Sequence, residues 1–220
     1  MPEIVLTHVT KRWDKFYAVD DLNLVIDDNA FVTLLGPSGC GKTTTLRMIA
    51  GLETPTSGRI TIGGRVVYDS EAGINIPPNK RKVGFLFQNP DRQICCNTVR
   101  EELLFGFKAL GMEGPEADAR VDALIEDFGF DPNEDPFLMN RGARQLLALA
   151  SIVVLAPPVV VLDEPTTGLD YRECVKVMDI VGRMHEGGAT VIMVCHDMEV
   201  VADYAEHCIV MSDGAVVDDE

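Results

Sequence analysis

One octapeptide near the start of the chain constrains its fold more than any other feature. The segment reads Gly36-Pro37-Ser38-Gly39-Cys40-Gly41-Lys42-Thr43 and fits the spacing G-x-x-x-x-G-K-[ST]. It follows the apolar run 31–35 and precedes the helical pattern 44–50. This order of strand, glycine loop and helix predicts a loop whose backbone N–H groups surround a phosphate. We expect Lys42 to reach the outer phosphates and the Thr43 hydroxyl to hold Mg²⁺.

The cysteines and the apolar stretches predict an intracellular chain without disulfides. The six cysteines show neither C-x-x-C spacing nor the framework of a secreted domain, and Cys95-Cys96 is expected in a semi-buried turn. No basic stretch followed by an apolar core opens the chain, so we expect no signal peptide. The longest apolar stretch, Leu146 to Leu162, is interrupted by Pro157-Pro158 and indicates a helix end followed by a strand. If the protein works at a membrane, another chain must supply the membrane span.

The charge balance argues against nucleic acid as a partner. The chain carries 35 acidic against 19 Lys and Arg residues, a formal net charge of −16. Such a surface repels phosphodiester backbones and keeps a protein in solution. We therefore expect no nucleic-acid partner.

The periodicity of apolar residues changes three times along the chain. Residues 3–35 alternate in short runs that predict half-buried strands, and residues 58–68 and 83–87 predict further strands. Between about 97 and 156 the period is helical, with helices expected at 99–110, 117–128 and 143–156. From Val159 onward, strand and helix alternate over 159–162, 172–185, 190–194, 198–206 and 208–211. The pattern predicts an α/β fold with a mainly parallel sheet, a β-rich front end and an inserted all-helical block.

A second group of residues places two carboxylates at a strand end. The run Val159 to Leu162 predicts a central strand, and Asp163 and Glu164 follow it directly. Asp163 is placed to hold Mg²⁺, and Glu164 to polarise a water that attacks the γ-phosphate. An Asp-Glu pair in this position is also typical of a helix-capping turn. The phosphate loop upstream in the same sheet favours the site over the turn.

Together these motifs give the chain a family resemblance over nearly its whole length. It resembles the nucleotide-binding subunit of an ATP-binding-cassette (ABC) transporter. The phosphate loop, Gln88, the Asp163-Glu164 pair, Gly168-Leu169-Asp170 and His196 appear in the order of that family. The resemblance implies a P-loop NTPase core with an N-terminal antiparallel β subdomain and ATP and Mg²⁺ as cofactors. It also implies a single domain over 1–220, with a core of 1–88 and 157–220 and a helical subdomain of about 89–156.

The resemblance also implies a role for each matching residue. Trp13 stands where the family has an aromatic that stacks on adenine, although a lone Trp is also a common filler. Gln88 is expected to touch the metal or the attacking water, and His196 the γ-phosphate. Asp170 belongs to a loop that crosses to a second subunit, whereas His8, His185 and His207 are expected at the surface. Catalysis is assigned to Glu164, His196 and Gln88, metal contacts to Thr43, Gln88 and Asp163, and nucleotide contacts to Trp13, Gly36, Pro37, Ser38, Gly39, Cys40, Gly41, Lys42, Thr43, Thr44, Asn140, Gly142 and Asp170.

One segment departs from the family pattern. Where the family reads Leu-Ser-Gly-Gly-Gln, this chain reads Met139-Asn140-Arg141-Gly142-Ala143, which we call the signature segment. In the family this segment caps the nucleotide on the opposite subunit. Asn140 can still cap the helix and donate from its amide. The Arg141 guanidinium suits a phosphate, but its bulk also suits keeping two subunits apart. We expect weakened hydrolysis at the site that this segment completes.

Two branches of the family resemble different parts of the chain. Residues 1–88 look like the ATPases of carbohydrate importers. Residues 87–93 and much of the chain after them look more like the energy-coupling-factor ATPases, which drive vitamin and metal uptake. Because either branch commonly continues past Glu220, a truncated or recombinant chain is one interpretation.

The resemblance implies hydrolysis of ATP to ADP and phosphate by two cassettes that face head to tail. A helical block that rotates in each cycle would pull on an integral-membrane permease, and import is the expected direction. The chain is therefore expected in the cytoplasm, peripheral on the inner face of the cell membrane. Two alternatives remain: a non-transport cassette ATPase, and a subunit that closes around ATP with weak hydrolysis. A P-loop small-molecule kinase fits worst, because it has no use for Gln88, Asp170 and His196 together.

Overall fold

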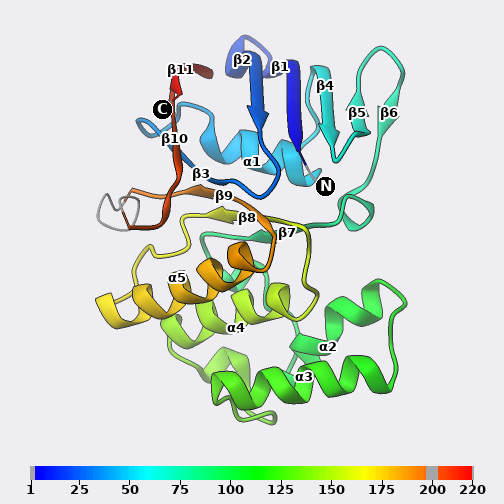
Figure 1. The fold of residues 1–220 in the computed structure, drawn as a ribbon, viewed down its shortest axis with the longest axis vertical. Helices are drawn as coiled ribbons and strands as arrows, with labels where there is room; N and C mark the ends of the chain where they lie inside the picture. The colour runs from blue at the N-terminus through cyan, green and yellow to red at the C-terminus, as the bar shows by residue number, and fades with distance from the viewer. Residues whose placement is uncertain (1–2, 197–202, 220) are drawn as a thin grey trace.

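An antiparallel sheet forms the N-terminal part of the molecule. The computed structural model describes residues 3–196 and 203–219. Alternating burial along β2 leaves one face of this sheet exposed and turns the other toward the core. The sheet has the order β2-β1-β4-β5-β6 (Figure 1). Its strands are β1 (Ile4–Trp13), β2 (Phe16–Ile26), β4 (Ser57–Ile62), β5 (Arg65–Asp69) and β6 (Ile74–Asn75).

A second, mainly parallel sheet carries the phosphate loop. Its order is β11-β10-β3-β9-β8-β7, with β11 paired antiparallel at the edge. The strands are β3 (Phe31–Leu35), β7 (Val83–Leu86), β8 (Val159–Asp163), β9 (Thr190–Val194), β10 (His207–Ser212) and β11 (Ala215–Asp219). Every residue of β8 is buried, because both faces of this sheet are covered.

Helices separate the two sheets and cover the far face of the parallel one. Helix α1 (Lys42–Ala50) lies between the sheets, where Leu46, Met48 and Ile49 share one apolar core with both (Figure 1). Helices α4 (Arg141–Val153) and α5 (Tyr171–Glu186) pack on the other face. Each helix therefore buries its apolar stripe against a strand surface.

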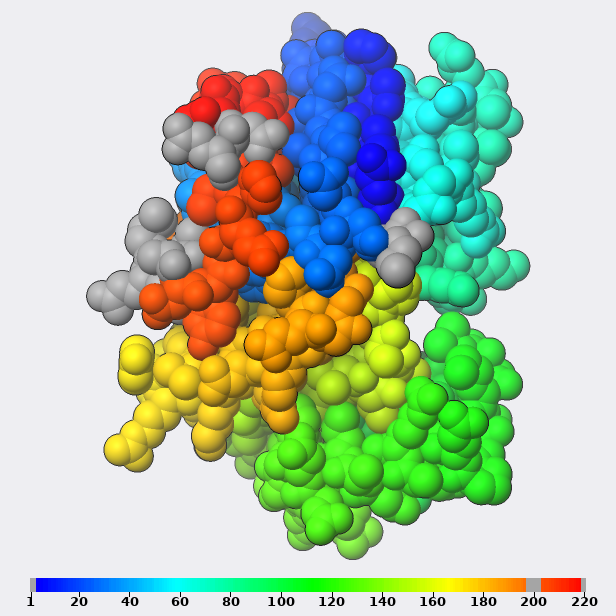
Figure 2. Space-filling view, viewed as in Figure 1, coloured from blue at the N-terminus to red at the C-terminus, as the bar shows by residue number. Residues whose placement is uncertain are grey.

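The helical block lies beyond α4. Helices α2 (Val99–Ala109) and α3 (Pro115–Phe128) share a separate apolar cluster with one side of α4. In the space-filling view this block forms the lower lobe of the molecule (Figure 2). Short 3₁₀ turns complete the connections: η1 (Pro78–Lys80), η2 (Pro90–Arg92) and η3 (Pro136–Leu138). Because α4 packs in two clusters, the division into core and helical subdomain stays a prediction.

The structure confirms the predicted layers and corrects some details. The mainly parallel sheet, the antiparallel front end and the inserted helices are all present, and most boundaries differ from the predicted ones by one to three residues. The predicted element 198–206 lies mostly outside the described residues. His185 is half-buried and not fully at the surface, because its ring packs on Phe31 and contacts Glu206. None of the helices in the described part of the chain has both the length and the apolarity to cross a bilayer.

Candidate nucleotide-binding site

The phosphate loop, residues 36–43, opens into a cavity between the two sheets. It connects β3 to α1, and the cavity has a volume of about 260 Å³. Most of the residues predicted to contact a nucleotide meet here. The lining consists of Trp13, Phe16, Ala18, Ser38, Gly39, Cys40, Gly41, Lys42, Thr43, Thr44, Glu164 and His196.

Two glycines of the loop are required by close packing. A Cβ on Gly36 would lie 2.1 Å from the Met211 carbonyl oxygen, and one on Gly41 would lie 2.3 Å from that of Ala18. Both residues also have φ values in the left-handed region, 137° and 99°. The loop can follow this path only with glycine at these two positions. The path brings the loop backbone close to the carbonyl oxygens of Ala18 and Met211.

The Lys42 side chain folds back onto the phosphate loop. Its Nζ donates to the carbonyl oxygens of Gly36 at 2.6 Å and Pro37 at 2.9 Å, and lies 3.3 Å from Cys40 Sγ. Only 5% of the residue is exposed. A buried ammonium group without a carboxylate partner needs such oxygen acceptors. It therefore places a positive charge within the loop, as phosphate binding requires.

Thr43 and Asp163 join the start of α1 to the end of β8. The Thr43 hydroxyl donates to Asp163 Oδ1 at 2.9 Å, and Arg47 lies at 4.0 Å from the other carboxylate oxygen. Burial raises the pKa of Asp163, and the Thr43 hydrogen bond and the Arg47 charge partly offset this. A hydroxyl and a carboxylate on neighbouring elements are the oxygen ligands that Mg²⁺ prefers.

Glu164 is fixed by three side chains. Its Oε2 accepts from Gln88 Nε2 at 2.6 Å and from the Thr167 hydroxyl at 2.9 Å, and its Oε1 lies 3.0 Å from His196 Nε2. Glu164 itself has a backbone φ of 52°, a value that residues other than glycine rarely adopt. Such strain persists only where the surroundings hold it, and it clusters at functional sites. The structure thus brings Gln88, Glu164 and His196 together, as the resemblance implied.

Two aromatic rings form one wall of the cavity. Trp13 ends β1 and Phe16 begins β2, and the rings stack at 6.4 Å with an angle of 7° between their planes. Lys11 Nζ lies 5.3 Å from the centre of the Trp13 ring. Trp13 is 47% exposed, so it is not a core filler. An exposed flat ring beside a phosphate loop offers a stacking surface to a base.

The residues of the signature segment lie outside this cavity. Asn140 caps α4 by accepting from the Ala143 N–H at 2.8 Å. Arg141 donates to the Thr167 carbonyl oxygen at 3.1 Å. Gly142 faces Glu173 so closely that a Cβ would lie 1.8 Å from its carboxylate. The predicted contacts of Asn140 and Gly142 with a nucleotide on a second subunit stay predictions.

Asp170 has a structural task within its own chain. It caps α5, where its Oδ1 accepts from the Glu173 N–H at 2.9 Å, while Glu173 Oε2 accepts from the Asp170 N–H at 3.0 Å. This reciprocal pair is a capping box. The expectation that Asp170 contacts a second subunit stays a prediction.

Four residues of the site were not predicted from the sequence. Phe16 extends the aromatic wall and Ala18 also lines the cavity, whereas Arg47 lies near Asp163 and Thr167 contacts Glu164. The sequence spacing could have predicted two of them. Arg47 is one helical turn after Thr43, and Thr167 follows Glu164 by three positions. Phe16 had no such signal, since only the β1–β2 hairpin brings it beside Trp13.

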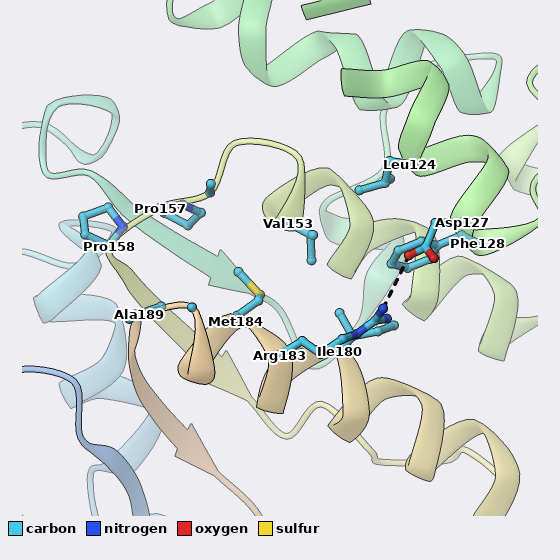
Figure 3. Close-up of a pocket in the computed structure, with 13 residues that line it drawn as sticks. Leu124, Asp127, Phe128, Val153, Pro157, Pro158, Ile180, Arg183, Met184 and Ala189 are labelled. Atoms are coloured by element: carbon cyan, nitrogen blue, oxygen red, sulfur yellow. Dashed lines mark ion pairs between the residues drawn. The ribbon is translucent and has the colours of Figure 1, made fainter. Parts of the chain in front are cut away.

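A larger hollow of about 500 Å³ lies elsewhere, between α3, the residues after α4 and α5 (Figure 3). Its wall is mostly apolar, and an ion pair of 3.6 Å between Arg183 and Asp127 spans its rim. None of the predicted site residues reaches it. Since it holds neither a phosphate loop nor paired carboxylates at a strand end, it is not the nucleotide site.

The geometry of the cavity fits a magnesium nucleotide. Helix α1 begins at Gly41 without a side-chain cap, so the N–H groups of its first turn are free to bind an anion. Lys42 supplies positive charge, Thr43 and Asp163 supply metal ligands, and Trp13 supplies a flat apolar surface. Glu164 is positioned as a proton acceptor at the end of β8.

Comparisons with known proteins identify the family of the chain. The family model described as ABC transporter matches residues 19–167. A putative ABC transporter ATP-binding protein of Caldanaerobacter subterraneus is 42% identical over 90% of this chain, which spans only 35% of that relative's length. The energy-coupling factor transporter ATP-binding protein EcfA2 of Enterococcus faecalis is 36% identical over 91% of this chain and 71% of its own.

A solved structure supports the same assignment. The dimeric ATP-binding cassette MJ0796, bound to ADP and phosphate in a post-hydrolysis state, superimposes with a TM-score of 0.84 and 29% identity, covering 99% of this chain and 97% of that one. With the family model and the relatives, this likeness confirms the P-loop NTPase fold. The chain belongs to the ABC transporter family.

Proposed function

We propose that the chain binds ATP with Mg²⁺, hydrolyses it to ADP and phosphate, and so drives a solute, by import, through an integral-membrane permease. The observation that carries the proposal is the meeting of the phosphate loop, the Thr43–Asp163 pair and the Glu164 cluster around one cavity. The names of the relatives support a transport role. The likeness to energy-coupling-factor ATPases supports uptake.

Each residue of the site takes a separate role in the reaction. The loop N–H groups and Lys42 bind the phosphates, and Thr43 and Asp163 hold Mg²⁺, which supplies charge stabilisation when bound. Glu164 accepts the proton of the attacking water, and Gln88 and Thr167 fix the carboxylate that does so. His196, beside the same carboxylate, donates a hydrogen bond to the developing negative charge. The fixed geometry is what lowers the barrier.

The site requires a second cassette for completion. The signature segment lies outside the cavity of its own chain, so the nucleotide that it would cap is one held by another copy or by a related subunit. The dimer of MJ0796 supports this arrangement. Working in this way, the chain would act in the cytoplasm, on the inner face of the membrane beside its permease.

Calorimetry with ATP and Mg²⁺ tests the proposal. The wild-type chain should bind ATP, and Lys42→Ala should abolish or strongly weaken this binding, because the loop loses its buried positive charge. Lys176→Ala, which removes a lysine of α5 remote from the cavity, is the matched control and should bind as the wild type does. Absence of ATP binding by the wild-type chain would overturn the proposal.

A second candidate function rests on Arg141. The side chain fills the place of a small residue in the family pattern and bonds the carbonyl oxygen of Thr167, whose hydroxyl holds Glu164. A cassette with this contact would close around ATP and turn it over slowly. Steady-state phosphate release, measured alongside ATP-dependent dimerisation, separates the two functions.

A further inference from the structure

Two adjacent cysteines and a glutamate form a compact cluster in the helical block, far from the phosphate loop. Cys95 and Cys96 lie between η2 and α2, and their Sγ atoms are 4.0 Å apart. Glu102 comes from the first turns of α2, and its Oε2 accepts from the N–H groups of Cys95 at 2.9 Å and Cys96 at 2.8 Å. Both sulfurs and a carboxylate oxygen lie within 4.8 Å of one another.

The charge of Glu102 lacks a cationic partner. The residue is only 3% exposed. Among the residues that the structure describes, no Lys, Arg or His lies within ion-pair distance of its carboxylate. The groups that bond to it at close range are neutral: the backbone N–H groups of Cys95 and Cys96 and their thiols. Buried carboxylates are ordinarily paired with a cation or bound to a metal, because an uncompensated charge in the interior costs several kcal/mol.

The two thiols lie beside this carboxylate, and Lys108 lines the hollow next to them. Three groups that each become negative on losing a proton thus crowd one small volume. A divalent cation in that volume replaces the thiol protons.

We propose that Cys95, Cys96 and Glu102 bind a thiophilic divalent cation of the Zn²⁺ class. Two sulfurs at the usual Zn–S distance in a tetrahedral site lie about 3.8 Å apart, close to the separation observed here. On binding, each thiol releases its proton to solvent and each sulfur donates an electron pair to the ion. One carboxylate oxygen of Glu102 supplies the third ligand.

The two cysteines border an open groove. A hollow of about 500 Å³ runs along α2 and the start of α3, and Cys95 and Cys96 form part of its wall. Asp118 also lines it, and Cys95 is exposed. The ion therefore has an entry path and access to water as a fourth ligand. It would tie the segment before α2 to the first turns of that helix.

Metal titration of the reduced, nucleotide-free chain tests the site. Cd²⁺ is added to follow the thiolate-to-metal charge-transfer absorption, and Zn²⁺ affinity is measured by competition with a chromophoric chelator. We expect a single equivalent to bind. Cys95→Ser and Cys96→Ser should each weaken binding by at least about tenfold, and Glu102→Gln should weaken it too. Cys208→Ser removes another partly exposed thiol and should bind as the wild type does.

Two results would overturn the inference. One is a wild-type chain that gives no charge-transfer absorption with Cd²⁺, a result that needs no variant and does not depend on how any variant folds. The other is a Cys95→Ser/Cys96→Ser double variant, shown to be folded by circular dichroism, that keeps the wild-type absorption. Because no nucleotide is present, neither result depends on ATP hydrolysis.

Discussion

Gln88 and Glu164 are 76 positions apart in the sequence and are joined by a hydrogen bond of 2.6 Å from Gln88 Nε2 to Glu164 Oε2. Gln88 follows β7 and leads toward the helical block, whereas Glu164 follows β8. The bond therefore connects the carboxylate that activates water to the segment that enters the helices. A shift of the segment that carries Gln88 should therefore move the Glu164 carboxylate.

Replacement of Gln88 by Ala should slow hydrolysis more than it weakens binding. Loss of the amide frees one side of the Glu164 carboxylate, and a misplaced catalytic group costs about 10- to 100-fold in rate. The phosphate loop is untouched, so ATP affinity should change less than about twofold. Phosphate release at saturating ATP and calorimetric titration give the two values. Equal losses in both would show that Gln88 acts in binding.

Trp13 gives a direct optical test of base stacking, because the chain contains a single tryptophan. ATP should change the fluorescence of the wild-type chain as the base covers the ring. Trp13→Ala should lower affinity by about 1–3 kcal/mol, the usual loss for a base-stacking aromatic, whereas Trp13→Tyr should keep most of it. If saturating ATP leaves the fluorescence unchanged while calorimetry shows binding, Trp13 is not the stacking residue.

Asp163 should reduce the stability of the nucleotide-free chain at neutral pH. Its folded-state pKa is raised, chiefly by burial, so the folded protein holds the proton more tightly than the unfolded chain. The carboxylate thus lowers stability above the folded-state pKa, and this effect vanishes as the pH falls below the unfolded-state value. Asp163→Asn should therefore raise the free energy of unfolding at pH 7 and raise it less at pH 4.

Urea denaturation at the two pH values measures this difference. The variant should also lose the extra stability that ATP with Mg²⁺ gives the wild type, because the metal ligand is gone. A variant that is less stable than the wild type at pH 7 would show that the Thr43–Asp163 bond outweighs the burial of the charge.

Arg141 should limit turnover in the assembled dimer. Arg141→Gly restores the small residue of the family pattern and removes the bond to the Thr167 carbonyl oxygen. Phosphate release should rise several-fold, and ATP affinity of the isolated chain should stay the same, because Arg141 lies outside the cavity. Arg120→Ala removes an exposed arginine of α3 outside the signature segment and serves as the control. An unchanged rate in Arg141→Gly would remove Arg141 from this role.

The sequence was informative where local pattern and chemistry coincide. The phosphate loop fixes its own conformation, because Gly36 and Gly41 occupy left-handed φ values against neighbouring carbonyl groups. The pairing of Thr43 with Asp163 follows from the parallel register that brings the ends of β3 and β8 to one edge. These features depend on short segments and on a known sheet geometry.

Features that depend on tertiary packing could not be predicted in this way. The partial burial of His185 arises from its packing against Phe31, which lies far from it in the sequence, and from its contact with Glu206. Likewise, a semi-buried turn was expected for both adjacent cysteines, but only Cys96 is half-buried, whereas Cys95 lies exposed on a groove of the helical block. In both cases the exposure of the side chain depends on the packing of segments that short-range sequence patterns do not describe.

The most direct test of the central claim is hydrolysis by Glu164→Gln with ATP and Mg²⁺, measured as steady-state phosphate release beside the wild type. The amide is nearly the same size as the carboxylate but cannot accept the proton of water, a role that contributes about 10²- to 10⁴-fold. We predict a loss of that size, with ATP binding retained and an ATP-dependent dimer visible by size-exclusion chromatography. Turnover equal to that of the wild type would contradict the assignment of Glu164 as the proton acceptor.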